Sequence, residues 1–231
     1  GATAEERFAL DAGALTVSMG SGEPITLTAG ADLCTFTAAA GGQVIASVVV
    51  SNSGVMLFRF AEQGGSAPVQ MLVPAQDLPK SELAGTWTVL GYEEGANNAA
   101  PNNLGHSMVK LQFNDAGDFV SGAECEGQTC NTWPAEDAMT AKKNDDGTFS
   151  LVDQYGTASM VLYKNSKGQN AMFINSDSGR MFGAKEQAET LPVVGAVTSS
   201  WDVTLDPMGS SSAVISHTAT VGTVEPASMW F

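Results

Sequence analysis

The amino-acid sequence predicts an all-β protein made of two related antiparallel units, sandwich or barrel-like, that pack together and contain little helix. Two observations predict this fold class. Short runs of four to nine residues rich in Val, Thr, Phe and Ile alternate with clusters of Gly, Asn and Asp along all 231 residues. The second half of the chain also repeats landmarks of the first half in the same order, which indicates an internal duplication.

Eight runs carry the clearest strand pattern, and turn-forming residues bound them. Ser53-Gly54 and Ser166-Lys-Gly168 stand where hairpin turns need a glycine at positive φ. Helix is expected only as a turn or two in Ala135–Lys142 and in Ala184–Glu189. The predicted strands are Val44–Ser51, Val55–Phe60, Thr86–Gly91, Ser107–Phe113, Ala158–Tyr163, Met172–Asn175, Trp201–Leu205 and Ala213–Thr218.

The repeat is clearest between residues 35–79 and 148–192. A shift of 113 positions without gaps gives nine identities in 45 positions, against about three or four expected by chance from average composition. Trp87 also matches Trp201 at a spacing of 114, and Asp11-Ala-Gly13 matches Asp115-Ala-Gly117 at 104. The nine identities are Thr35/Thr148, Phe36/Phe149, Val48/Val161, Asn52/Asn165, Ser53/Ser166, Phe60/Phe173, Ala75/Ala188, Leu78/Leu191 and Pro79/Pro192.

We therefore divide the chain into a first β unit at residues 1–100 and a second at residues 101–231. Glu94–Asn103, with four asparagines and a proline, is the best candidate for a loop or connection between them. The second unit carries an insertion at about residues 122–142 that contains two cysteines, and it ends in a closing strand at Ser212–Val221. Packing the copies together, or exchanging strands between them, would hide more apolar surface and more strand edges than two separate units.

Acidic residues outnumber basic ones by 25 to 10, which gives a formal net charge of −15. Nucleic acid is excluded as a partner, because phosphate binding needs a basic face. No apolar run approaches the roughly 18 residues that a membrane-spanning helix needs. The chain begins Gly-Ala-Thr-Ala-Glu without an initiator Met, which we interpret as the mark of a removed export segment. We expect an exported protein, periplasmic or at the cell surface. It would be a lipoprotein if a lipid anchor lies upstream.

Cys125 and Cys130 bracket a polar loop, and a disulfide between them would stabilise the fold by about 2 kcal/mol. Zinc ligation is the alternative, but the spacing is CxxxxC and the sequence holds no second cysteine pair. A disulfide agrees with an exported location. Cys34 lies in the apolar run Leu33-Cys-Thr-Phe36, so we expect a buried, inert thiol there.

The signatures of common enzyme classes are missing from the sequence. It contains no GxSxG, HExxH, phosphate-binding loop or GxGxxG after a strand. His106 and His217 lie in strand-like runs, and nothing in the sequence indicates that either forms a catalytic pair with a serine. Adjacent carboxylates on a strand point to opposite faces, so no pair suits glycosidase chemistry. We expect no enzyme and no cofactor, and a carboxylate- or metal-dependent enzyme ranks third among the functional hypotheses.

Calcium binding is the best ionic alternative. Asn114–Asp118 and Lys143–Gly147 concentrate oxygen ligands in tight turns, as Ca²⁺ requires. Neither segment fits the twelve-residue EF-hand loop, and Asp, Asn and Gly are ordinary turn residues. We interpret both segments as turns and expect no metal site.

The segment Leu83-Ala-Gly-Thr-Trp87-Thr-Val resembles the glycine-x-tryptophan opening of lipocalin-type barrels, over fewer than ten residues. The resemblance implies a barrel from about Leu83 toward Arg180, forming a cup for an apolar ligand. The matching Ser199-Ser-Trp201 lacks the glycine and leaves too little chain for a second barrel. A core tryptophan present in both copies explains the pair more simply, so we do not assign the family.

These observations favour a non-enzymatic, exported binding or surface-assembly module, whose partner is an unidentified protein or small molecule. The alternative is a lipocalin-like carrier of a small apolar ligand. Trp87 and Trp201 are the candidate pocket residues for that alternative.

Overall fold

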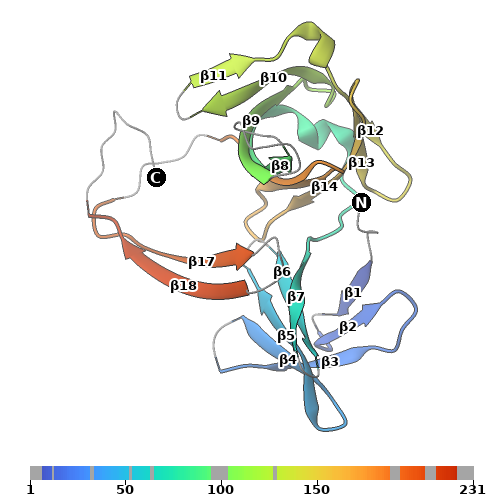
Figure 1. Ribbon diagram of the computed structural model, residues 1–231, viewed down its shortest axis with the longest axis vertical. Coiled ribbons are helices and arrows are strands. Elements are labelled where there is room, and N and C mark those ends of the chain that lie inside the picture. The colour runs from blue at the N-terminus through green and yellow to red at the C-terminus, as the bar shows by residue number, and fades with distance from the viewer. Residues whose placement is uncertain are drawn as a thin grey trace.

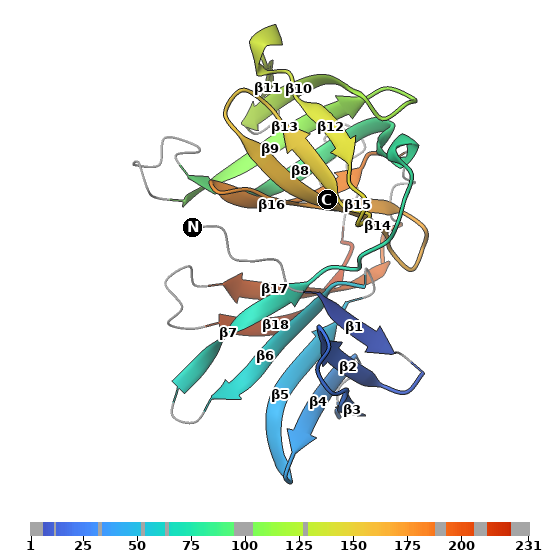
Figure 2. The ribbon, with the colours of Figure 1, turned by 90° about the vertical axis from the view of Figure 1, so that its right-hand side faces the viewer.

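The computed structural model describes residues 7–11, 13–31, 34–51, 54–62, 65–94, 104–126, 129–187, 193–205 and 212–222. These residues form strands almost throughout, with short 3-10 helices between some of them. Two antiparallel sheets lie one above the other along the long axis of the molecule, with a two-stranded hairpin beside them (Figures 1 and 2). The predicted all-β class with two packed antiparallel units is confirmed.

The first sheet is a seven-stranded meander in which each strand pairs with the next along the chain. It curves into a half-barrel around a small core that includes Val17, Leu27, Val48 and Phe58. Its strands are β1 (Phe8–Asp11), β2 (Thr16–Met19), β3 (Ile25–Ala29), β4 (Thr35–Ala40), β5 (Gln43–Val50), β6 (Met56–Glu62) and β7 (Gly65–Leu72).

The second sheet has nine strands and curls into a near-barrel. Its first strand, β8 (Gly85–Glu94), pairs with β9 (Leu104–Phe113) on one side and with its last strand, β16 (Gly179–Lys185), on the other. The strands between are β10 (Phe119–Glu126), β11 (Thr129–Thr132), β12 (Thr140–Lys143), β13 (Phe149–Val152), β14 (Thr157–Lys164) and β15 (Asn170–Asn175). The pairing of the first and last strands joins all nine into one curled sheet with β11 and β12 at its edges, and we call this sheet the barrel.

The barrel encloses the larger hydrophobic core, because apolar residues at every second position of a strand share one face. The core includes one tryptophan, two phenylalanines and two methionines. Its buried members are Leu83, Trp87, Val89, Val109, Leu111, Phe113, Ala141, Phe149, Leu151, Met160, Leu162, Met172 and Ile174.

The segment that joins the two sheets runs across one end of the barrel and ends in the 3-10 helix η1 (Lys80–Leu83). Three ion pairs attach it to the barrel's turns and strands. Their N–O distances are 2.6 Å for Lys80–Asp118, 2.5 Å for Lys143–Asp77 and 2.9 Å for Lys164–Glu82. We call this end of the barrel its base.

The division between the two sheets differs from the predicted division at residues 100 and 101. It lies between Leu72 and Gly85, because β8 belongs to the barrel. The predicted connection at Glu94–Asn103, of which residues 95–103 lie outside the described residues, joins two strands of one sheet, since Glu94 is paired with Leu104. An asparagine-rich loop looks the same in sequence whether it joins two sheets or two neighbouring strands.

All eight predicted strands coincide with observed ones, and the last two form the hairpin β17 (Val197–Leu205) and β18 (Ser212–Thr220). The helix predictions were less accurate. Ala135–Lys142 contains only the 3-10 turn η3 (Ala135–Asp137), and Ala184 and Lys185 complete β16. The cysteine insertion contains β11, which pairs with β10 and extends the barrel sheet by one edge strand.

Strands β4–β7 and β13–β16 follow the same order and pairing, spaced by about 113 residues. Within β5 and β6, however, the ungapped alignment is wrong by one residue. It matches Val48, buried in the first core, with Val161, on the opposite strand face from the buried Met160 and Leu162. A spacing of 114 matches Val48 with the buried Leu162 instead. Because side chains alternate between faces, the identities Val48/Val161 and Phe60/Phe173 do not mark equivalent positions. The duplication itself stays a prediction.

Candidate functional site

Trp87 lies at the base of the barrel, where η1 leads into β8. Its indole Nε1 donates a hydrogen bond to the carbonyl oxygen of Leu83, 2.7 Å away, and both residues are 0% exposed. Gly85 between them has a φ of 110°, which residues with a side chain rarely adopt. The Gly-x-Trp segment therefore closes the base and anchors the first barrel strand.

The interior beside Trp87 is filled with side chains. Phe149, Met160, Leu162 and Met172 are all fully buried. Gly183 leaves room for this packing, since a Cβ there would lie 2.5 Å from the Cγ of Met172. This part of the barrel is a packed core. Its tryptophan, one of the two predicted pocket residues, is a core residue.

The opposite end of the barrel, which we call the mouth, is polar. Glu93 lies on the same face of β8 as Trp87 and Val89, and the hydroxyl of Ser178 donates a hydrogen bond to its Oε1 at 3.3 Å. Burial raises the pKa of Glu93, and the carboxylates of Glu124 and Asp153 raise it further. Among the residues that the structure describes, no three His, Cys, Asp or Glu side chains are grouped to hold a metal ion.

The outer face of the barrel carries a continuous row of apolar residues across five neighbouring strands. The pairs Val161–Phe173, Phe173–Phe182, Phe182–Leu90 and Leu90–Met108 are each directly opposite one another in the strand registers. We call these five residues the apolar band. Leu90 is 54% exposed and Phe182 is 36% exposed, and the rings of Phe173 and Phe182 lie 4.9 Å apart between centroids. Sequence reasoning missed the band, because it joins residues from β14, β15, β16, β8 and β9.

Polar and aromatic residues border the apolar band on its mouth side. Tyr92 is 60% exposed and is paired with Arg180 on one side and His106 on the other. The rings of Tyr92 and His106 meet edge to face, with centroids 6.1 Å apart. His106, which the sequence placed in a strand, thus lies on the outer face of the barrel.

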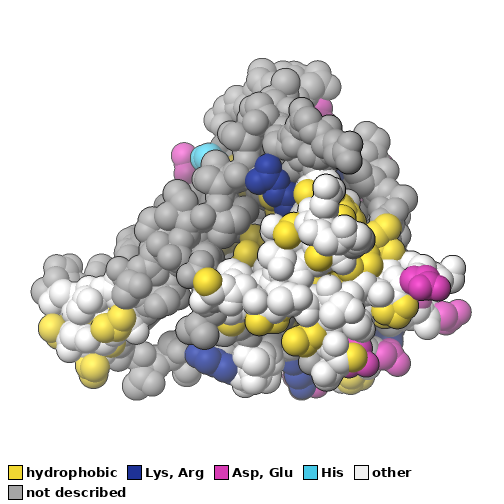
Figure 3. Space-filling view, turned by 90° about the horizontal axis from the view of Figure 1, so that it is seen from below, with side chains coloured by type: hydrophobic (Ala, Val, Ile, Leu, Met, Phe, Trp, Pro, Cys, Tyr) yellow, Lys and Arg dark blue, Asp and Glu magenta, His cyan; other side chains and the backbone are white. Residues whose placement is uncertain are grey.

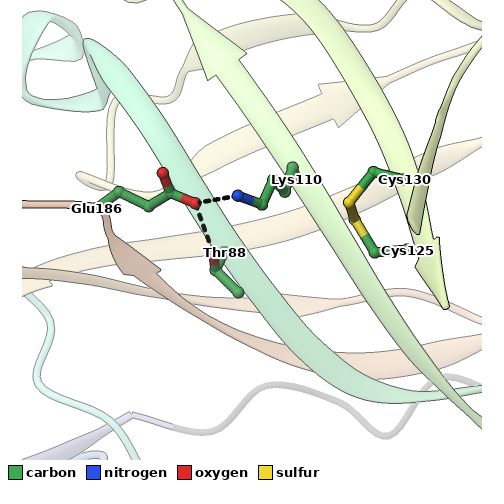
Figure 4. Close-up of a disulfide and its surroundings, with 5 residues drawn as sticks. All are labelled: Thr88, Lys110, Cys125, Cys130 and Glu186. Carbon is green, nitrogen blue, oxygen red and sulfur yellow. Dashed lines mark hydrogen bonds and ion pairs between the residues drawn. A yellow bond between two sulfur atoms is a disulfide. The ribbon is translucent and has the colours of Figure 1, made fainter. Parts of the chain in front are cut away.

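An ion pair borders the band on its base side (Figure 4). Glu186 accepts from Lys110 at 2.9 Å and from the hydroxyl of Thr88 at 2.8 Å. These interactions, led by the hydrogen bond from Lys110, lower the pKa of Glu186. The apolar band therefore has hydrogen-bonding groups on both long sides, as protein contact surfaces commonly do.

The predicted disulfide is present, and it joins Cys125 on β10 to Cys130 on β11 (Figure 4). The two residues are directly opposite each other in the hairpin. The expectation for Cys34 was wrong, because this thiol is free and exposed. Cys34 lies in a turn with a φ of 61°, just before β4 begins at Thr35, so it is not part of the strand that was expected to bury it.

The two segments considered for calcium are hairpin turns, as we interpreted them. In each, the amide of the glycine donates to the asparagine carbonyl three residues earlier, Gly117 to Asn114 at 2.8 Å and Gly147 to Asn144 at 3.2 Å. Asp118 pairs with Lys80, and that hydrogen bond lowers the pKa of its carboxyl. Hydrogen bonds from Thr148 lower the pKa of Asp146, which also pairs with Arg7.

Trp201 and His217 lie on the separate hairpin, where Trp201 is paired with Ser216 on β18. The structure thus places the two candidate pocket residues, Trp87 and Trp201, on strands of different sheets. It does not bring them into one described pocket.

The first sheet also exposes apolar side chains. Seen from below, they are interspersed with polar ones (Figure 3). They include Leu10, Leu15, Met19 and Val44. These residues are dispersed over β1, β2, β5 and the turn before β2, and they do not form one row in the strand registers. No helix among the described residues is long and apolar enough to cross a membrane.

No protein-family model matches the chain, and no curated protein or solved structure matches it. The candidate site therefore depends on the chain's own geometry, and the apolar band is its most coherent surface feature.

Proposed function

We propose that the protein is a non-enzymatic binding or surface-assembly module that contacts a partner protein through the apolar band. The observation that carries this proposal is the continuity of the band across five strands, with Leu90 and Phe182 exposed at its centre. A contiguous apolar patch rimmed by polar groups is typical of a protein contact surface.

The composition of the band and its rim supports a protein partner. Tyr, Phe, Met and Arg are enriched in protein interfaces, and Tyr92, Phe182, Met108 and Arg180 lie together here. The paired strands that carry the band are also rigid, so little conformational freedom is lost when a partner binds. The net charge of −15 favours a partner with a basic rim around an apolar centre, because opposite net charges raise the association rate.

Export belongs to the same proposal. The disulfide Cys125–Cys130 supports it, since disulfides persist in oxidising compartments such as the periplasm and the cell surface. The partner is then expected in the same compartment.

Site-specific photo-crosslinking tests the contact surface. A benzophenone amino acid at position 90, in cells that produce the protein naturally, should form a covalent adduct with one partner protein. The same probe at Tyr155, which is 79% exposed and lies outside the band, is the control. The purified partner should then bind the wild type and lose at least tenfold in affinity for Phe182→Asp. Equal adducts from both positions, or unchanged affinity of Phe182→Asp, would contradict the proposal.

A lipocalin-like carrier is the second candidate function. Two observations favour its barrel, whereas the fully buried side chains packed around Trp87 count against a ligand cavity at that end. Helix η1 and Gly85-x-Trp87 close the base, and the first and last barrel strands are paired. The sheet runs from Gly85 to Lys185, close to the span that the resemblance implied. Titration with a fluorescent fatty acid tests this alternative: saturable binding of one molecule per chain supports it, and lack of saturable binding contradicts it.

A further inference from the structure

The two sheets differ at one position in their strand order. In the barrel, β16 pairs with β15 on one side and with β8 on the other. Its counterpart β7 pairs with β6 and forms an edge of the seven-stranded sheet among the described residues. An edge strand presents unpaired backbone groups, which proteins generally cover or block. The position next to β7 is where the barrel has β8.

The chain offers one strand that matches β8, and this is β17. Trp201 of β17 lies 114 residues after Trp87 of β8. The two strands also follow corresponding runs along the chain, since β8 comes after β4–β7 and β17 comes after β13–β16. The hairpin partner of β8 is β9, and that of β17 is β18. Strand β8 already crosses from the run it follows into the other sheet, where it pairs with β16.

In this structure β17 and β18 form a two-stranded sheet of their own beside the first sheet. We infer that this hairpin docks along the free edge of β7, with β17 antiparallel to β7, and so extends the first sheet to nine strands. The sheet then has the order β3–β4–β5–β6–β7–β17–β18, which matches β12–β13–β14–β15–β16–β8–β9 strand for strand. The first half of the chain thereby supplies β8, with Trp87, to the barrel, and the second half supplies β17, with Trp201, to the first sheet. This arrangement goes beyond the proposed function and does not depend on it.

The chemistry of the β7 edge fits this occupant. Leu72 packs against the first core but is only partly buried. The pair Phe58–Gln70 corresponds to Met172–Gly183, so β7 and β16 correspond at a spacing of 113. Leu72 is therefore the counterpart of Lys185, which is paired with Trp87. The same register places Leu72 opposite Trp201 and Val69 opposite Thr204. In Figure 2 the hairpin and β7 lie on the same side of the first sheet.

Pro68 limits the length of this pairing. It has no backbone N–H to donate, and proline in a sheet is confined to edges, strand starts and bulges. The ladder is therefore expected at Val69–Leu72, paired with Trp201–Thr204.

Engineered disulfides test the inferred register in the full chain. In a Cys34→Ser background, Val69→Cys combined with Thr204→Cys should form an intramolecular disulfide, seen as a monomer that is two hydrogens lighter. The matched control combines Val69→Cys with Ala213→Cys. Ala213 is directly opposite Thr204 on β18 and therefore lies one strand farther from β7. Two strands apart means about 10 Å, which is too far for a disulfide.

Three outcomes would overturn the inference: a control that crosslinks as readily, no crosslink in either variant, or crosslinking only between two molecules. The last result would show that a second copy supplies the hairpin.

Hydrogen exchange gives a second measurement that needs no cysteine. The amides of β7 that point away from β6 should be protected in the wild type and exchange at least tenfold faster in Val203→Pro, while the barrel amides stay unchanged. Fast exchange of these β7 amides in the wild type would also overturn the inference.

Discussion

The indole nitrogen of Trp87 lies 2.7 Å from the carbonyl oxygen of Leu83, and this hydrogen bond joins η1 to the first strand of the barrel. Both residues are fully buried, so the carbonyl has no solvent to replace the indole as donor. This hydrogen bond therefore holds η1, which closes the base, against the buried core.

Trp87→Phe is expected to destabilise the protein by about 2 kcal/mol or more. The substitution leaves the buried Leu83 carbonyl without its donor and opens a small cavity. Urea unfolding followed by circular dichroism measures the loss. Trp133→Phe is the control, because Trp133 is only partly buried against Phe119 and should lose less. Equal stability of the two variants would show that the Trp87–Leu83 bond contributes little.

Gly117→Ala is expected to loosen the joining segment at the base. A Cβ at Gly117 would meet the carbonyl oxygen of Lys80, and the glycine has a φ of +80°. A residue other than glycine in that conformation costs about 1–3 kcal/mol before the contact is counted. Thermal unfolding should show a lower midpoint. Gly156→Ala is the control, since its Cβ would meet nothing within 4 Å. An unchanged midpoint for Gly117→Ala would mean that the segment does not lie against this turn.

The thiol count of the native protein should be one. Cys125 and Cys130 are joined, and Cys34 is free and exposed. A thiol reagent such as DTNB should therefore react with one group per chain without denaturant, and with none in Cys34→Ser. After reduction in denaturant, the wild type should give three. A wild type that gives three without reduction would contradict the disulfide.

Glu93→Gln should stabilise the protein at neutral pH and leave it unchanged in acid. The folded-state pKa of Glu93 is raised above its ordinary value of 4.5, first by burial. Between the two pKa values the folded state binds more protons than the unfolded state, so stability falls as the pH rises through this window. The variant lacks that loss, and its melting temperature should exceed that of the wild type at pH 7 but not near pH 4.

Glu94→Gln is the matched control for this pH dependence, because Glu94 is the exposed neighbour on the same strand. It should change stability by less than about 0.5 kcal/mol at either pH. A Glu93→Gln variant that is less stable than the wild type at pH 7 would contradict the direction of the shift.

The sequence was sufficient for features that depend on neighbouring residues. Strand runs such as Val44–Ser51 and turns such as Asn114–Asp118 are encoded in local patterns of side-chain type. The disulfide was also predictable, since Cys125 and Cys130 are close enough to face each other across a hairpin. Cys34 was placed wrongly, because an apolar neighbourhood in sequence does not reveal the left-handed turn that exposes it.

Tertiary structure alone decided which strands share a sheet. Only the short Gly-x-Trp resemblance, which we did not assign, implied a barrel from about Leu83 toward Arg180. Nothing else in the sequence indicates that β8 pairs with β16, about 90 residues later, so the sheet division was not predicted before Gly85. The apolar band depends on the same pairing, since Phe182 and Leu90 become neighbours only when β16 pairs with β8. A single strand's alternation predicts which residues share a face, whereas registers between distant strands are set by how the whole core packs. That is why the core tryptophan was visible in the sequence and the surface proposed for binding was not.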